Sequence, residues 1–170
     1  MRKSQLFELI SAIKILAPEE TPIIVGSQAV HLLTNFPPEI VRHSIECDFL
    51  IIGGKSETRA EINKKLGVFS QYQIEHGFYA DALGLATVIL PTGWQKRLQK
   101  LTNKDGEIIA NVAEIYDIAV SKLIAGREKD YVFLRELILS DHITIDIFLE
   151  RAKLVKEMPQ SEILILASKI

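Results

Sequence analysis

Apolar residues recur at helical spacing in the first stretch of the chain, at Leu6, Ile10, Ile13 and Leu16. This spacing predicts a helix over Ser4–Leu16. After Pro18 and Pro22, the apolar run Ile23–Val25 predicts a short buried strand. A Gly-Ser turn then leads into a second short helix, Gln28–Leu33, which Asn35 and the two prolines after it end.

A second strand is predicted where apolar and acidic residues alternate, from Ile45 to Ile52. Ser56 can cap a polar helix that runs to about Leu66. The next segments have a strand-like composition, and Ile108–Val112 predicts one further strand. The three strand-like segments before that strand are Phe69–Glu75, Gly77–Ala80 and Ala86–Leu90.

From Glu114 onward the chain has the pattern of helices, with three apolar stripes and a last short segment after Pro159. Strands in the first two thirds followed by helices predict an α+β fold with a C-terminal helical segment. We expect an α/β core over residues 1–112 and a helical segment over 113–170 that packs on it as part of one compact unit.

Composition excludes several classes of protein. The 170 residues are 48% hydrophobic and 25% charged, which is typical of a chain with a full core. The formal net charge of -2 gives no basic footprint for nucleic acid. Cys47 has no partner for an internal disulfide, and no Cys or His spacing predicts zinc. We also see no signal sequence and no membrane-spanning run, and therefore expect a cytoplasmic protein that does not contact a membrane.

The most informative pair of residues is Glu46 and Asp48. Because side chains alternate along a strand, these two carboxylates share one face, and Cys47 between them points to the core. Neighbouring carboxylates repel each other unless solvent or a divalent cation offsets their charge, and magnesium favours such ligands together with substrate phosphates. The alternative is an ordinary amphipathic strand with an acidic, solvated face.

The Gly26-Ser27 turn could bind phosphate. It places backbone N–H groups and a hydroxyl at the start of a helix, where phosphate oxygens bind well, and glycine allows close approach to the main chain. The alternative is a simple strand–helix turn with Ser27 as the N-cap.

Taken in order, these segments resemble the nucleotidyltransferase superfamily related to DNA polymerase beta. Val25-Gly26-Ser27 matches its hydrophobic-Gly-Ser motif, Ser44–Phe49 matches its paired acids, and Arg42 fits a basic residue that commonly precedes the pair. The segment Ile115–Asp130 is similar to a helical region of the bacterial AbiEii toxin group. Gly77–Asp81 and Leu90–Trp94 also resemble an uncharacterised branch of that group.

The resemblance implies a nucleotidyltransferase-like mixed sheet with flanking helices, and roles for particular residues. Glu46 and Asp48 would be catalytic and bind Mg²⁺ or Mn²⁺, with Asp81, or alternatively Glu75, as the third acid. Gly26, Ser27, Lys122 and Lys129 would bind the nucleotide, and Asp130 could assist as a base. Lys122 and Lys129, seven residues apart, are expected to share one helix face. The alternative is a solvated helix face on which Arg127 and Asp130 form a weak surface pair.

The implied function is metal-dependent transfer of a nucleoside monophosphate from an NTP to an acceptor hydroxyl, with a role in a toxin–antitoxin pair as one setting. Glu46 replaces the commoner Asp, so an inactive relative that binds nucleotides or a cognate antitoxin-type protein is the alternative, and a ligand-free structural module is a third. The acceptor could be a tRNA end, a protein side chain or a small molecule. A local basic patch of Lys96, Arg97 and Lys100 keeps RNA among the candidate acceptors despite the near-neutral net charge.

Overall fold

The computed structural model describes residues 1–53 and 56–170. Its sheet has five strands in the order β3-β2-β1-β5-β4. The strands are β1 (Ile23–Val25), β2 (Glu46–Leu50), β3 (Tyr79–Leu83), β4 (Gln99–Thr102) and β5 (Ile108–Val112). Strands β1/β2 and β4/β5 pair antiparallel, whereas β1/β5 and β2/β3 pair parallel. The sheet is therefore mixed and the fold is α+β, as the sequence predicts.

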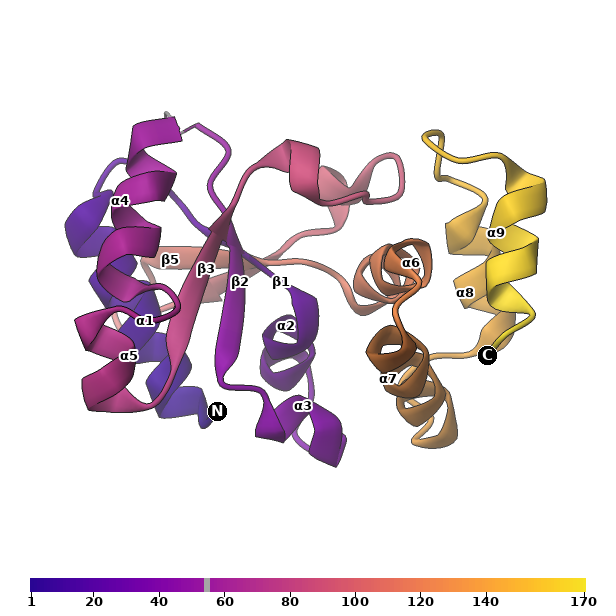
Figure 1. Cartoon of the computed structure of the whole chain (residues 1–170), viewed down its shortest axis with the longest axis horizontal. Coiled ribbons are helices and arrows are strands. Elements are labelled where there is room, and N and C mark those ends of the chain that lie inside the picture. The colour runs from indigo at the N-terminus through magenta and orange to yellow at the C-terminus, as the bar shows by residue number, and fades with distance from the viewer. Residues whose placement is uncertain (54–55) are drawn as a thin grey trace.

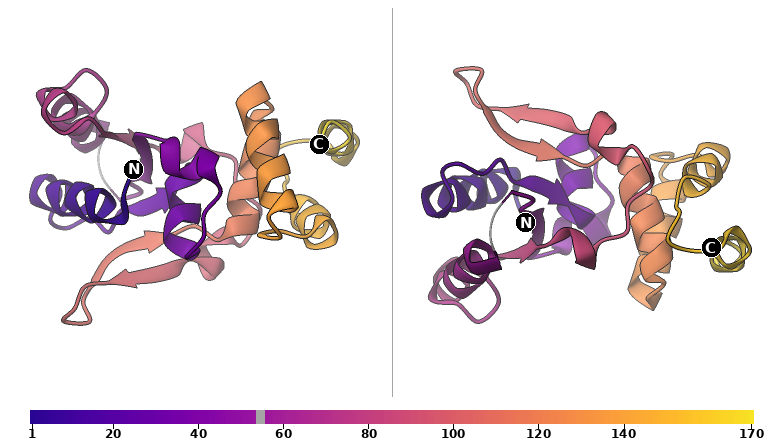
Figure 2. Two further views of the ribbon diagram at one scale, coloured as in Figure 1. Left: turned by 90° about the horizontal axis from the view of Figure 1, so that it is seen from below. Right: turned by 90° about the horizontal axis from the view of Figure 1, so that it is seen from above.

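Helices lie on both sides of this sheet (Figure 1). One side carries α1 (Lys3–Leu16), α4 (Ser56–Leu66) and α5 (Gln71–His76). The other side carries α2 (Gly26–Leu33) and α3 (Glu39–His43), followed by α6 (Ile115–Ala125) and α7 (Glu128–Leu139). Helices α8 (Ile145–Ala152) and α9 (Gln160–Ala167) lie farthest from the sheet, and the β4–β5 hairpin extends away from the body (Figures 1 and 2). No described helix is long and apolar enough to cross a membrane.

Two strand predictions are wrong. The segment predicted as a strand over Phe69–Glu75 contains helix α5, because Ser70 accepts a hydrogen bond from the Gln73 N–H and caps the helix start. Gly77 ends it in the left-handed conformation, at φ 77°. The segment Ala86–Leu90 is not a strand either. It begins inside a 3₁₀ turn, η1 (Leu85–Thr87), which the Thr87 hydroxyl closes by donating to the Gly84 carbonyl.

A third correction concerns the helical segment near Lys122. Helix α6 ends at Ala125, and Gly126 adopts φ 63° as its left-handed C-cap. Helix α7 starts only at Glu128, so Lys122 and Lys129 lie on different helices and do not share one helix face. Gly126 thus allows the chain to turn between the two helices.

Candidate functional site

The Gly-Ser turn and the acidic strand meet because β1 and β2 are neighbours. Val25 pairs with Asp48, so Gly26 follows directly beside the Asp48 side chain. Gly26 has φ 68°, and a Cβ built on it would lie 2.0 Å from Asp48 Oδ2. Only glycine fits here, for reasons of both backbone conformation and space. This contact fixes the Asp48 carboxylate against the start of α2.

Three carboxylates converge on one face of the sheet. In the parallel pairing of β2 and β3, Glu46 lies beside Tyr79 and Asp48 beside Asp81. Because these positions have the same parity on their strands, all four side chains point to the same side. One ligand oxygen from each of Glu46, Asp48 and Asp81 lies within 4.8 Å of the others. Asp81 therefore joins the pair, whereas Glu75, the alternative third acid, is exposed on α5 and accepts a hydrogen bond from Gln71.

The charges of this cluster are mutually unfavourable. Burial, together with the charges of Glu46 and Asp81, raises the pKa of Asp48 to about 6 against the opposing effects of Lys122 and Arg127. Burial and the charge of Glu46 also raise the pKa of Asp81. Burial, the charge of Glu46 and a hydrogen bond to it raise the pKa of Tyr79 to about 12. In each case burial has the largest effect and the neighbouring negative charge adds to it.

The donor set fits a hard divalent cation. It consists of three carboxylates, and magnesium prefers oxygen ligands in which one or two carboxylates combine with substrate phosphates. A cation placed among Glu46, Asp48 and Asp81 would offset the burial and the mutual repulsion that raise the pKa values of the two aspartates. The cluster can therefore hold a metal ion.

A cationic wall faces the acids from the α6–α7 turn. Lys122 Nζ lies 3.3 Å from Asp130 Oδ1, and Arg127 Nε lies 2.6 Å from Asp130 Oδ2. Lys122 also lies over the ring of Phe133, 5.7 Å from its centroid. Asp130 is only 1% exposed, so its pairing with Arg127 is not the surface pair that the alternative interpretation expected. Two cations are thus held in place around one buried carboxylate.

This geometry changes the role expected for Asp130. Both of its carboxylate oxygens receive cationic donors, with Arg127 Nη2 also donating to Oδ1 at 3.1 Å. Burial opposes ionisation, but the hydrogen bonds from Arg127 and the charge of Lys122 outweigh it and lower the pKa of Asp130. An acid that is so well paired is a poor proton acceptor, and it is better suited to position Lys122 and Arg127.

The acidic face of the sheet forms one wall and the α6–α7 turn the other, and between them lies a cleft of about 550 Å³. All the residues expected from the sequence to form the site line it: Gly26, Ser27, Glu46, Asp48, Asp81, Lys122, Lys129 and Asp130. The rest of the lining is mostly apolar and comes from α3, the chain after β3, and helices α6 and α7. Residues far apart in the sequence, from Val25 to Phe133, therefore share one cavity, with acids on the sheet and cations on the helical side.

One family model matches the chain over residues 4–163, and its description is nucleotidyltransferase of unknown function (DUF6036). The protein belongs to this family. Searches of curated proteins and of solved structures found no match. Membership of this nucleotidyltransferase family implies an NTP substrate. It leaves the substrate specificity and the biological role open.

Other expected features of the chain lie differently from the sequence prediction. Val25, not Ser27, is the N-cap of α2, and Ser27 lies inside the first turn. Arg42 is exposed on α3 and lines a separate pocket. In the expected basic patch, Lys96 and Lys100 are exposed, but Arg97 is engaged by Asp117.

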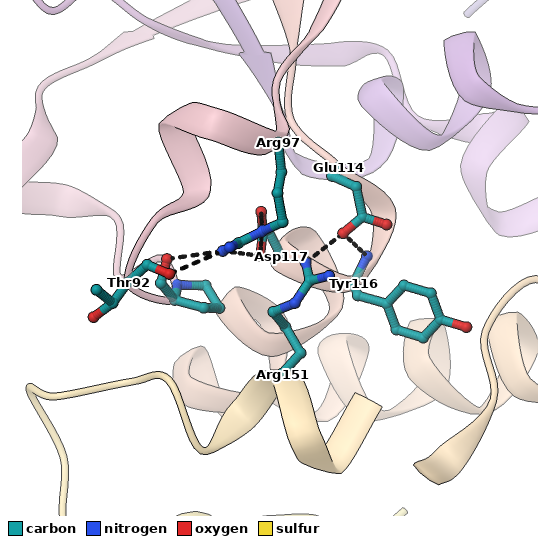
Figure 3. A network of polar contacts seen from close by, with 7 residues as sticks. Thr92, Arg97, Glu114, Tyr116, Asp117 and Arg151 are labelled. Atoms are coloured by element: carbon teal, nitrogen blue, oxygen red, sulfur yellow. Dashed lines mark hydrogen bonds and ion pairs between the residues drawn. The ribbon is translucent and has the colours of Figure 1, made fainter. Parts of the chain in front are cut away.

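That last contact is part of a network that sequence reasoning missed (Figure 3). Arg97 Nε donates to Asp117 Oδ2 at 2.9 Å, and its Nη2 donates to the carbonyls of Pro91 and Thr92. Arg151 on α8 donates to Asp117 Oδ1 at 2.7 Å and to Glu114. Asp117 is 1% exposed at the start of α6, the helix that carries Lys122. The network therefore fixes α6 between the segment before β4 and the outer helices.

Arg127 lines the cleft and Tyr79 lies beside Glu46 on the acidic face of the sheet, and neither received a role from the sequence. The only sequence signal for Arg127 was its position three residues before Asp130, which is also common in solvated helices. Tyr79 could have been found from its place two residues before Asp81, since alternate residues of a strand share a face.

Proposed function

We propose that the protein is an enzyme that transfers a nucleoside monophosphate from an NTP to an acceptor hydroxyl. The acceptor oxygen forms a bond to the α-phosphorus, the bond from that phosphorus to the bridging oxygen breaks, and pyrophosphate leaves with its electron pair. The acceptor proton passes to a nearby base or to water. One observation carries the proposal: the triad of Glu46, Asp48 and Asp81 lies in one cleft with Gly26 and Lys122.

We assign a different role to the residues of each wall of the cleft. Glu46, Asp48 and Asp81 would hold Mg²⁺ or Mn²⁺, which when bound supplies charge stabilisation and lowers the pKa of an acceptor hydroxyl. Gly26 and Ser27 would offer main-chain N–H groups and a hydroxyl to phosphate oxygens at the start of α2.

On the helical wall, Lys122 and Arg127 would neutralise the triphosphate, with Lys129 at the exposed edge of the cleft. Asp130 would hold the first two in place. Positioning and charge neutralisation account for most of the rate enhancement in phosphoryl and nucleotidyl transfer.

A second candidate function is nucleotide binding without turnover. Glu46 stands where the resembling superfamily commonly has Asp, and its carboxylate receives a hydrogen bond from Tyr79. A carboxylate that is one methylene longer and already bonded changes the geometry at the metal. In this case the protein would bind NTP and metal but release no pyrophosphate.

Calorimetry with each of the four NTPs, with and without magnesium or manganese, tests the binding step. We expect metal and nucleotide to bind with positive coupling in the parent protein and without coupling in Asp48→Asn, because the ion reverses the local charge. Equal nucleotide affinity in all these conditions would exclude the metal site. Pyrophosphate release in the presence of candidate acceptors then separates the enzyme from the binding protein.

The identity of the acceptor belongs to the same proposal. A tRNA end, a protein side chain and a small molecule are the three classes to screen, in a cytoplasmic setting where NTP and magnesium are available. The toxin–antitoxin role rests on the resemblance of Ile115–Asp130 to the AbiEii group. Co-expression that relieves growth arrest would identify a partner antitoxin, whereas unimpaired growth on overexpression of the protein alone would argue against this role.

A further inference from the structure

A second pocket, of about 400 Å³, lies at the start of α1 and is lined largely by basic groups. Its lining residues are Met1, Arg2, Lys3, Gln5, His31 and Arg42. Within residues 1–53 and 56–170, Arg2, Lys3 and Arg42 form no ion pair with a carboxylate. The only bond from the Lys3 ammonium in this part of the chain is to the Thr34 carbonyl, 3.2 Å away. Three positively charged side chains therefore line one hollow that has no acid among its described lining residues.

His31 forms the inner end of this pocket and is 7% exposed. Its Nδ1 lies 3.2 Å from Gln28 Oε1. The Gln28 amide nitrogen donates to the Val41 carbonyl, which leaves Oε1 as an acceptor, so His31 Nδ1 carries the proton. The other ring nitrogen, Nε2, is therefore available to a ligand in the pocket that His31 lines. Among the described residues of the chain, none forms a hydrogen bond with Nε2.

The surroundings of His31 show that the pocket is electropositive. Burial lowers the pKa of His31, and the charges of Lys3, the N-terminal amino group and Arg42 lower it further. The pocket also lies at the N-terminal end of the 14-residue helix α1, where the helix dipole adds positive charge. A bound anion would offset this repulsion, as a cation would in the acidic cluster.

We propose that this pocket is a phosphate-binding site, separate from the nucleotide cleft. Guanidinium and ammonium donors in a concave site match the several oxygens of a phosphate group. The Nε2 of His31 accepts from a phosphate hydroxyl while the ring is neutral, and it becomes a further donor when the bound anion favours protonation of the ring. Helix α3 stands between the two sites, because Ile40 and Ser44 line the cleft while Arg42 lines the pocket. The phosphate is either a free phosphate ion or a phosphate group of a nucleic acid, and the site does not depend on the catalytic proposal.

Phosphate titration followed by ¹H–¹⁵N signals of the histidine side chains tests the site. We expect inorganic phosphate to shift the His31 signals saturably, while those of His142 and His76, which lie elsewhere, stay in place. Lys3→Gln and Arg42→Gln should each weaken the phosphate affinity by about tenfold, the loss of one charge-assisted bond. Lys104→Gln, an exposed lysine outside the pocket, is the matched control and should leave the affinity unchanged.

Two further arms identify the source of the phosphate and separate this site from the cleft. A 5′-phosphorylated oligonucleotide that binds more tightly than inorganic phosphate, and loses that advantage in Arg42→Gln, identifies nucleic acid as the source. Equal affinity for the two identifies free phosphate. Asp48→Asn should keep the His31 response even if metal-dependent NTP binding is lost. No shift at His31, equal affinity in Arg42→Gln and Lys104→Gln, or binding of an acidic peptide in preference to phosphate would overturn the proposal.

Discussion

Replacing Asp48 with Asn should stabilise the metal-free protein at neutral pH, although it removes a residue of the proposed active site. The pKa of Asp48 rises from 3.8 to about 6 on folding because the carboxylate is partly buried beside Glu46 and Asp81. The charged form is therefore less favourable in the folded state than in the unfolded chain. Asn mimics the neutral acid in shape and carries no charge.

The size and the pH range of the effect follow from the pKa shift. A difference of about 2 units corresponds to an upper limit of ~3 kcal/mol, and solvent screening reduces this to about 1–2 kcal/mol. The penalty is fully present above the folded pKa of about 6 and disappears as the pH falls below the unfolded value near 4. At ~2–4 °C per kcal/mol for a chain of this size, Asp48→Asn should melt roughly 2–8 °C above the parent at pH 7.5.

Thermal melts in EDTA at pH 7.5 and pH 4, repeated at pH 7.5 with magnesium, measure the effect. We expect the advantage of Asp48→Asn to fall to about a fifth at pH 4, which is close to the unfolded pKa. Magnesium should raise the melting temperature of the parent but not of the variant. Asp105→Asn, at an exposed turn position, is the matched control and should change neither value. A lower melting temperature for Asp48→Asn at pH 7.5, or an equal gain at both pH values, would refute the account of the acidic cluster.

Three further substitutions test the other parts of the site. Gly26→Ala should abolish metal-dependent NTP binding in calorimetry and destabilise the fold, because its Cβ would lie 2.0 Å from a carboxylate oxygen. The control Gly106→Ala has a similar φ of 83° but open space around it, and it should lower the unfolding free energy by only about 1 kcal/mol. Asp117→Asn should lower the unfolding free energy in urea by about 3 kcal/mol, since it removes the buried charge that two partly buried arginines share. Glu150→Gln on the surface should change the unfolding free energy by less than about 0.5 kcal/mol. Lys122→Gln should weaken NTP affinity about tenfold at unchanged magnesium affinity, and an unchanged NTP affinity would return this lysine to a purely structural role.

The sequence by itself determined the α+β class, the strands that carry the site and the pairing of Glu46 with Asp48 on one face. These features depend on local periodicity and on the turn chemistry of Gly26, both of which can be read along the chain. The resemblance added Asp81, Lys122 and Asp130 to the list of candidates, and all of them line the same cleft. The division into residues 1–112 and 113–170 stays a prediction.

Only the tertiary structure decided how the residues of the two walls are paired. The register of β2 against β3 selected Asp81 over Glu75, because strand pairing depends on contacts that sequence periodicity does not specify. Burial of Asp130 between Lys122 and Arg127 replaced a surface pair by a fixed cationic wall. The helix over Gln71–His76 formed because Ser70 and Gly77 cap its ends, although its composition is typical of a strand. Charge environments of this kind arise when distant segments fold together, so they cannot be derived from the order of residues alone.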